Sequence, residues 1–277
     1  MATLADDLQF VHVCYYGSYG TGKTTALATM AHGGTVKYIR SDRGIRQRPL
    51  RNLGIPIGSI EPIDQFDPIS LGKTIEEWRS MLAEDPAALA GVCLDTATEL
   101  VARRIELYVD RDWKAHVAAS KKAHVEIDRL DRYTSGDGRE QYKGVTQEVR
   151  RIVRHLYDLP CHLGVAAQQR TEDGKLTPDV NPALRGDLIG YMDYVIRLEQ
   201  DGEWPDGRAL VVGYPKPSAT QVAKDRDGIL PSRFADPTFL RLLAYSSGEL
   251  DYHTDPVQLA YKDLLAKRKA DEEAELD

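Results

Sequence analysis

The stretch that decides the fold is YYGSYGTGKTTALATM, residues 15–30. From Gly17 its spacing is G-x-x-x-x-G-K-T, the pattern of a phosphate-binding P-loop, and its lysine is Lys23. An apolar, strand-like run precedes the loop at residues 10–15, and good helix formers follow it at residues 24–31. Strand, glycine loop and helix is the order that a P-loop requires. The pattern therefore indicates a phosphate site rather than a simple glycine turn before a helix.

Each residue type in this loop has a chemical role. The glycines let the backbone curl so that its N–H groups face phosphate oxygens, and the positive end of the helix adds to the attraction. Lys23 would reach the terminal phosphates, and the hydroxyl of Thr24 would ligate Mg²⁺. We therefore expect ATP and Mg²⁺ as cofactors. The expected nucleotide-binding residues are contiguous: Gly17, Ser18, Tyr19, Gly20, Thr21, Gly22, Lys23, Thr24 and Thr25.

A P-loop also needs an acid that holds the Mg²⁺ shell, and the segment GVCLDTATEL supplies one. Its apolar residues 92–94 run directly into Asp95, so we expect Asp95 to be the Walker B acid and to serve the metal together with Thr24. The next residue is Thr96, whereas many ATPase motors place a glutamate base there. The base that activates water must therefore come from another segment.

Two acidic residues compete for the role of base. Asp42 follows the second apolar run in VKYIRSDRG and is the leading candidate, although a helix cap or a turn residue has the same appearance. Glu99 is the alternative if the chain after Asp95 turns back toward the phosphate. A later strand ends in LGVAAQQR, where Gln168 or Gln169 could sense the γ-phosphate or be no more than an exposed polar strand end.

The order of apolar runs predicts the fold class. Helical patterns separate most of the β-rich runs, and strands that alternate with helices indicate one α/β domain over residues 1–277, with a mostly parallel central sheet flanked by helices. Residues 255–270 are expected to form a C-terminal helix capped at Asp255, with an acidic tail after it. The expected strands lie at residues 10–15, 36–39, 92–94, 163–166, 194–198 and 209–214.

Two segments lack this rhythm. Residues 110–140 are polar and charged and contain a Ser-Gly-Asp-Gly breaker, while residues 170–185 have turn residues and no periodicity, so both are expected to be loops or excursions from the sheet. Their cations are candidates for contact with DNA, although singly most of them are better explained as solvated charge. These candidates are Lys114, Lys121, Lys122, Arg139, Arg170 and Lys175.

The composition narrows the class of protein. The 277 residues include 36 Lys and Arg against 43 Asp and Glu, for a net charge of −7, which argues against coating of nucleic acid by bulk charge but leaves room for a local basic loop. No apolar stretch approaches the ~20 residues of a membrane span and no signal peptide is apparent, so we expect a cytoplasmic protein without a membrane partner. Cys14, Cys93 and Cys161 are expected to be buried free thiols.

Five motifs in order give the chain a resemblance to the RecA-like ATPases over about residues 8–240: GSYGTGKTT, YIRSDRG, VCLDTATEL, VAAQQR and VAKDRDG. Within that family the chain most resembles the phage-encoded proteins of single-strand annealing and recombination that consist of little more than a RecA core. The resemblance implies a RecA-like P-loop NTPase core that hydrolyses ATP, binds single-stranded DNA and forms a homo-oligomer, either a ring or a short filament. It also implies a possible single-strand-binding protein as partner and, for a phage protein, the host cytoplasm as location.

The resemblance also implies roles for matching positions. Asp42 stands where the family keeps its catalytic base, one methylene shorter than the usual glutamate, and Gln168 stands where it keeps a γ-phosphate-sensing glutamine. Residues 170–185 correspond to a DNA-binding loop, and the excursion before Tyr142 to a first such loop. Lys224 and Arg226 correspond to cations that reach the nucleotide site of the neighbouring protomer.

Other P-loop classes compete with this interpretation. One alternative is a packaging or partition ATPase, or a nucleotide kinase whose second substrate is small. Another is a binding module that holds ATP and turns it over very little. A kinase would phosphorylate a nucleoside monophosphate without DNA, whereas the RecA-like interpretation predicts ATP turnover coupled to single-stranded DNA.

Overall fold

The computed structural model describes residues 10–41, 45–64, 67–123 and 138–274. The helices are α1 (Lys23–Ala28), α2 (Gln47–Asn52), α3 (Pro68–Glu84), α4 (Ala97–Ala123), α5 (Gly138–Tyr157), α6 (Pro182–Tyr191), α7 (Phe239–Ser246) and α8 (Pro256–Ala274), with two short 3-10 helices, η1 (Thr29–Gly33) and η2 (Ile57–Ser59). The strands are β1 (His12–Gly17), β2 (Val36–Arg40), β3 (Ile60–Ile63), β4 (Gly91–Asp95), β5 (His162–Glu172), β6 (Lys175–Pro178), β7 (Tyr194–Glu203), β8 (Ala209–Tyr214), β9 (Lys224–Asp225) and β10 (Phe234–Ala235).

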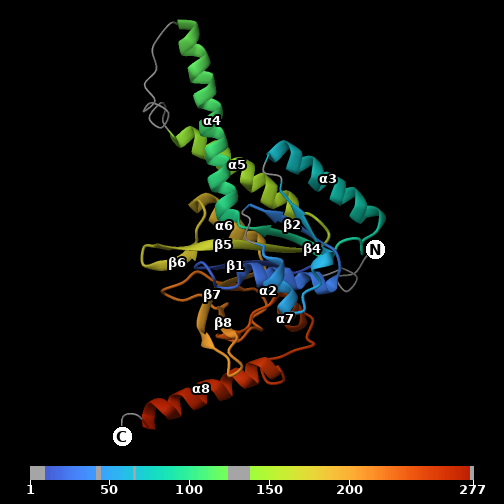
Figure 1. The fold of residues 1–277 in the computed structure, drawn as a ribbon, viewed down its shortest axis with the longest axis vertical. Helices are drawn as coiled ribbons and strands as arrows, with labels where there is room; N and C mark the ends of the chain where they lie inside the picture. The colour runs from blue at the N-terminus through green and yellow to red at the C-terminus, as the bar shows by residue number, and fades with distance from the viewer. Residues whose placement is uncertain (1–9, 42–44, 65–66, 124–137, 275–277) are drawn as a thin grey trace.

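These strands form one mixed sheet with the order β10-β8-β7-β1-β5-β4-β2-β3, to which β6 is added at β5 and β9 at β7. The pairs from β7 to β3 along this order are parallel, and the pairs made by β6, β8, β9 and β10 are antiparallel. Figure 1 shows the sheet edge-on, with helices above and below it. The prediction of a mostly parallel α/β sheet flanked by helices is therefore confirmed.

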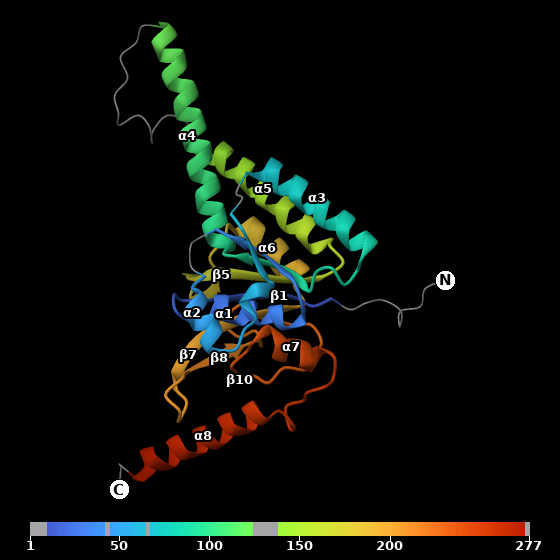
Figure 2. The same cartoon turned by 45° about the vertical axis from the view of Figure 1, so that its right-hand side comes forward.

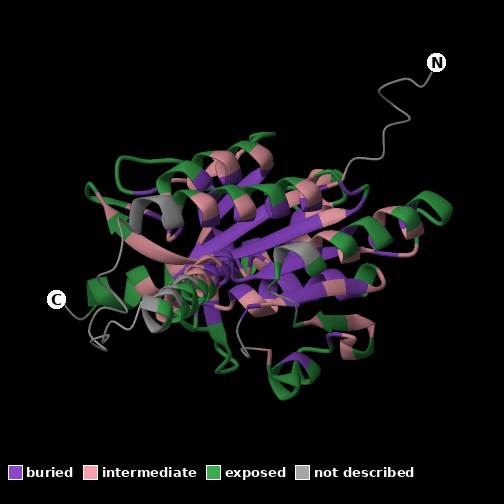
Figure 3. Ribbon diagram, turned by 90° about the horizontal axis from the view of Figure 1, so that it is seen from above, coloured by how far each residue is buried: buried purple, intermediate pink, exposed green. Residues whose placement is uncertain are grey.

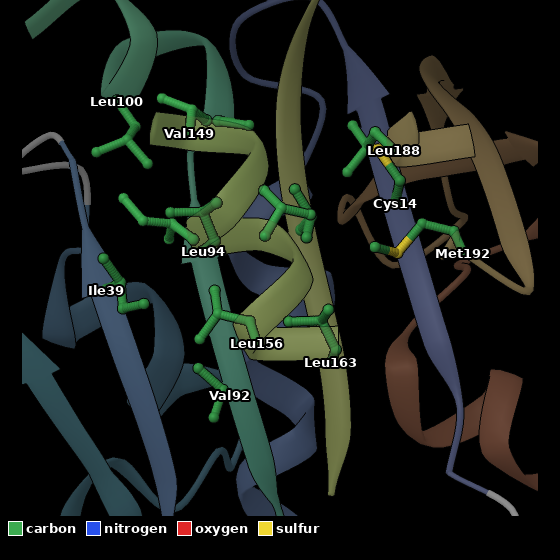
Figure 4. Close-up of a cluster of buried hydrophobic side chains, with 14 of the residues drawn as sticks. Cys14, Ile39, Val92, Leu94, Leu100, Val149, Leu156, Leu163, Leu188 and Met192 are labelled. Carbon is green, nitrogen blue, oxygen red and sulfur yellow. The ribbon is translucent and has the colours of Figure 1, made fainter. Parts of the chain in front are cut away.

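Two hydrophobic layers cover the two faces of the sheet. One layer packs α3, α5 and α6 over the strands, and Figure 4 shows Val149 and Leu156 of α5 facing Leu94 and Val92 of β4. The other layer joins α1, η1 and α7 to the opposite face. Seen from above, the buried strands lie between helices whose outer sides are exposed (Figure 3). Each fully buried aliphatic side chain contributes about 1.5–3 kcal/mol, so these two layers hold the sheet in place.

Apolar residues at helical spacing face the core in both α3 and α5. Ile75, Trp78 and Leu82 of α3 are all buried, and so are Val145 and Leu156 of α5. All six expected strands form. The short edge strand β3 was not predicted. Its sequence gives little indication of a strand, because it contains Pro62 and its two middle residues are exposed.

The expectation that residues 110–140 are irregular needs correction. Residues 110–123 belong to α4, which ends at Ala123. This part of α4 projects away from the sheet together with the start of α5 (Figures 1 and 2). Residues 124–137 lie outside the described part. The charged residues of 110–123 misled the prediction because they are compatible with a solvated helix as well as with a loop.

The expectation of a loop at residues 170–185 is also wrong. β5 runs on through Glu172, turns at Asp173 and Gly174, and returns as β6, after which Asn181 caps α6. Both turn residues have positive φ, 49° and 75°, which is the conformation of a tight type I′ hairpin turn. The dipeptide Asp-Gly was the signal that could have predicted this hairpin.

The C-terminal helix is longer than expected. α8 begins at Pro256, where the side chain of Asp255 accepts from the N–H of Val257, and it ends at Ala274 rather than at residue 270. Tyr261 of this helix is buried, whereas the neighbouring Ala260 is exposed. The three cysteines are buried free thiols, as predicted. Among the described residues, no helix is long and apolar enough to cross a membrane.

Candidate nucleotide site

The P-loop has the backbone that its glycines require. Gly20 and Gly22 have φ values of 79° and 80°, in the left-handed region that favours glycine. Gly17 allows a close approach, because a Cβ there would lie 2.4 Å from the carbonyl oxygen of Leu198 on β7. The hydroxyl of Thr21 donates to the carbonyl oxygen of Ser18 at 2.9 Å and closes the loop. This fixed curve leads directly from β1 into α1.

Lys23 lies inside this curve. Its Nζ donates to the carbonyl oxygens of Gly17 at 2.8 Å and Ser18 at 2.7 Å, and to Oε1 of Gln168 at 3.3 Å. The side chain is buried except toward a pocket that Lys23 lines together with Tyr19, Asp95 and Gln168. The ammonium group is therefore positioned beside the space that a terminal phosphate would occupy.

Thr24 and Asp95 meet on the other side of the same pocket. The Thr24 hydroxyl donates to Oδ2 of Asp95 at 2.7 Å, and the Tyr38 hydroxyl on β2 donates to the same oxygen at 2.8 Å. The register of the sheet explains the position of Tyr38, because β2 and β4 are paired with Tyr38 beside Cys93, two residues before Asp95. Sequence reasoning missed Tyr38, which orients the acid and lies 57 residues away from it in the chain.

The strand between these groups supplies the third element of the site. β5 lies between β1 and β4, and Gln168 follows its buried segment. The N–H of Gln168 donates to the Thr98 hydroxyl at 2.9 Å, and its carbonyl oxygen accepts from the N–H of Asp179 at 2.7 Å. The side-chain amide therefore faces Lys23 while the backbone is tied to the start of α4 and to the end of the hairpin.

The expected site residues fall into three groups. The structure brings Lys23, Thr24, Asp95 and Gln168 together around one pocket. Asp42 lies outside the described residues. Glu99 is in the first turn of α4, where its carboxylate accepts from Nε of Arg103 at 3.2 Å.

Lys224 and Arg226 lie at the edge of the sheet where the parallel strands begin, opposite the edge that carries the P-loop. β9 pairs with Tyr194 and Val195 at the beginning of β7, whereas the P-loop follows the end of β1. Lys224 donates to the carbonyl oxygens of Ile189 and Gly190 at the end of α6, and Arg226 pairs with Asp193. Burial and the nearby Arg226 lower the pKa of Lys224. The two cations therefore do not reach the P-loop of their own chain.

The candidate DNA cations also have different surroundings. Lys114, Lys122 and Lys175 are exposed. Arg170 forms ion pairs with two carboxylates: its Nη2 lies 3.5 Å from Oε1 of Glu172, and its Nη1 lies 3.7 Å from Oδ1 of Asp179. The side chains of Lys121 and Arg139 lie outside the described part.

A second, more apolar pocket adjoins the phosphate pocket, and sequence reasoning did not anticipate it. Gly20 and Gly22 line both pockets, and the second one continues over Leu53, Val211 of β8 and Asp236. Asp236 has a positive φ of 41°, and its carboxylate accepts from Nε1 of Trp204 at 2.9 Å. Burial raises the pKa of this carboxyl above its usual value. An apolar pocket beside a phosphate pocket suits the nucleoside part of a nucleotide.

The residues present fit ATP and Mg²⁺. A hydroxyl and a carboxylate side by side are the protein ligands that Mg²⁺ uses together with phosphate oxygens, and among the described residues no group of three or more His, Cys, Asp or Glu forms an all-protein metal site. Bound ATP with Mg²⁺ would supply the phosphoryl group and neutralise the charge on its oxygens. Lys23 would then hold the terminal phosphate, Thr24 and Asp95 would hold the metal shell, and Gln168 would contact the group that leaves.

Comparison with known proteins agrees with this geometry. No curated protein matches the sequence significantly. Residues 9–227, which include the P-loop, Asp95, Gln168 and β9, match the family described as AAA domain. The match covers most of the chain, from the start of β1 to the segment after β9. The chain therefore belongs to the AAA domain family and is a P-loop ATPase.

Proposed function

We propose that the chain couples ATP hydrolysis to binding of single-stranded DNA and promotes annealing or recombination. The observation that carries the proposal is the path of β5. The strand passes between β1 and β4, presents Gln168 to Lys23, and continues without a break into the hairpin that carries Arg170 and Lys175. A change at the phosphate would thus act on a segment that protrudes from the sheet.

The backbone contacts support coupling along this path. The carbonyl oxygen of Gln168 holds the N–H of Asp179 at 2.7 Å, and residues Gln169–Glu172 pair with β6. A movement of Gln168 when a phosphate leaves would therefore displace both strands of the hairpin, not the side chain alone. Order–disorder or shift of a segment on loss of a γ-phosphate is an established kind of nucleotide switch.

The oligomer is part of the same proposal. Lys224 and Arg226 cannot serve the P-loop of their own chain from the opposite edge of the sheet, and the side chain of Arg226 is 51% exposed. In a ring or short filament that stacks one edge against the other, these cations would approach the neighbour's phosphate pocket. A positive charge supplied in trans stabilises the transition state of phosphoryl transfer.

The test is ATP turnover with and without single-stranded DNA. We expect turnover to rise when DNA is added and to stay low with nucleoside monophosphates alone. As a matched pair, Gln168→Ala should lose the stimulation by DNA, while Gln169→Ala, one residue further along β5, should keep most of it. Turnover that DNA does not change would contradict the proposal, and transfer of phosphate to a nucleoside monophosphate would identify a kinase instead.

A further inference from the structure

Helix α2 carries a concentration of positive charge that sequence reasoning did not select. Residues 45–55 contain Arg46, Arg48 and Arg51 and no acidic residue, so the segment has a charge of +3 in a chain of net charge −7. All three side chains are exposed. Among the described residues none of the three has an ion-pair partner, and Arg51 only contacts the neutral side chain of Gln47 at 3.4 Å.

The hairpin offers a useful contrast. Its surroundings include Arg170, Lys175 and Arg185, but Glu172 pairs with both arginines and Asp179 lies beside Arg170. With Asp173 in the turn, the three positive charges of residues 170–185 meet three negative ones. An incoming polyanion would have to displace these carboxylates at the hairpin, whereas no carboxylate of the described residues pairs with the arginines of α2.

The arginines of α2 stand on an anchored support. Leu50 and Ile55 are buried in the core, and Gly54 has a φ of 71°. The N–H of Ile55 donates to the carbonyl oxygen of Leu50 at 3.0 Å, and the N–H of Gly54 to that of Arg51 at 2.9 Å, which together form a Schellman motif. The capped helix keeps Arg48 and Arg51, three residues apart, on neighbouring positions of one side.

The position of α2 places this charge beside the nucleotide. α2 follows β2, whose end lies next to Asp95, and Figure 2 shows it beside α1. Leu53, directly after α2, is 48% exposed and lines the apolar pocket together with Gly20. Tyr19, the neighbour of Gly20, is 87% exposed and presents its aromatic ring at the rim of the phosphate pocket.

We propose that Arg46, Arg48 and Arg51 form an arginine face that binds the phosphate backbone of single-stranded DNA beside the nucleotide pocket. The guanidinium fork suits phosphate oxygens, and several arginines in succession suit a polymer of phosphates better than one free anion. Tyr19 favours a single strand over a duplex, because unpaired bases can stack on an exposed ring. The inference rests on the proposed function, since it assigns to this face part of the DNA contact.

The test is the salt dependence of binding to labelled oligo(dT), with ATP and Mg²⁺ present. Three phosphate contacts to a single strand account for a slope of about 2 in log K against log salt, at about 0.7 per contact. The variant Arg46→Gln/Arg48→Gln/Arg51→Gln should flatten the slope by about that amount and weaken binding by about tenfold or more at low salt. The triple Arg→Lys variant should keep the slope, because the slope counts charges.

The matched control is Lys143→Gln/Arg151→Gln/Arg154→Gln, which removes three exposed positive charges from α5. If this control lost as much slope as the α2 variant, the effect would come from the net charge of the protein rather than from the position of the arginines, and the inference would be overturned. A wild-type slope in the α2 variant would also overturn the inference. In that case the proposed function would still stand, provided that the wild-type protein binds oligo(dT). No binding by the wild-type protein would refute both. Melting curves and affinity for a fluorescent ATP analogue show whether the α2 variant is folded, and weaker ATP binding with normal DNA binding would assign the arginines to the nucleotide instead.

Discussion

The two edges of the sheet use their positive charges in different ways. At the edge where the parallel strands end, Lys23 is held by the carbonyl oxygens of the loop that surrounds the phosphate pocket and by Gln168. At the edge where they begin, Arg226 pairs with Asp193, whose carboxylate also accepts from the N–H of His12 at 2.9 Å. A bound phosphate can replace the oxygens that accept from Lys23 at the first edge. The partners at the second edge tie strand ends together.

The first edge therefore carries the groups suited to the reaction, and the second edge carries groups that stabilise the fold. Burial alone would raise the pKa of Asp193, but its hydrogen bonds to His12 and the charge of Arg226 lower it below its usual value, so the carboxylate stays charged and in place. Changes at the first edge should therefore remove activity from a folded protein. Changes at the second should affect stability or contacts between protomers.

The largest effect is expected from Lys23→Ala. Loss of a positioned cation from a phosphoryl-transfer site costs several kcal/mol in the transition state, so ATP turnover should fall by about a thousandfold or more. Circular dichroism should show an intact fold, and Lys73→Ala, an exposed lysine on α3, should behave like the wild type. Unchanged turnover in a folded Lys23→Ala protein would contradict the role of this edge.

The next effect concerns the base. Asp42→Asn should slow hydrolysis by about a hundredfold or more while ATP binding changes little, because a base acts on water in the transition state. Asp95→Asn should instead weaken Mg²⁺-dependent binding, since it removes the partner of Thr24. Glu99→Gln is the comparison: if it abolishes hydrolysis and Asp42→Asn does not, the base is Glu99 in spite of its contact with Arg103.

A mixing experiment tests whether the two edges meet between protomers. Arg226→Ala alone should lower turnover, and turnover of the wild type should rise more steeply than linearly with protein concentration. Mixing Arg226→Ala with Lys23→Ala protein should restore activity, because the intact Arg226 of one mutant can complete the intact P-loop of the other. Normal turnover of Arg226→Ala at every concentration would confine this residue to its pair with Asp193.

The smallest effect is a pH dependence at the second edge. Burial and the neighbouring His12 lower the pKa of His162, at the start of β5, to about 4. The unfolded chain titrates near 6.5, so it binds more protons than the native state between these values, and stability is lost as the pH falls from about 6.5 to about 4. For a partly exposed group the loss is on the order of 1–2 kcal/mol.

The matching variant is His162→Asn, whose amide oxygen can replace Nδ1 as acceptor for the N–H of Val11. Urea denaturation at pH 7 and pH 4.5 should show a smaller loss in this variant than in the wild type. Asp193 does not obscure the comparison, because its lowered pKa moves its own contribution to more acidic pH. Equal losses in the two proteins would contradict the assignment to His162.

The parts of the fold that local sequence determines were predictable. The P-loop, the six apolar strands and the faces of α3 and α5 follow from glycine positions and from periodicity. β9 and β10 have two residues each and exist only through pairing with β7 and β8, so no local pattern marks them. The same holds for contacts that join distant residues, such as Lys23 with Gln168 and Tyr38 with Asp95. The hairpin of β5 and β6 did have a local signal, Asp173-Gly174, and was missed because its flanking residues do not alternate.

The three buried thiols make the protein a convenient host for a chemical label. Burial raises the pKa of Cys14 and of Cys161 to about 12 and that of Cys93 well above its usual value, so at neutral pH almost no thiolate is present at any of them. A maleimide dye added to the native protein should therefore leave all three unmodified. A single cysteine introduced on the exposed side of α5, as in Arg151→Cys, would carry the dye alone and report association of protomers by fluorescence without removal of any native cysteine.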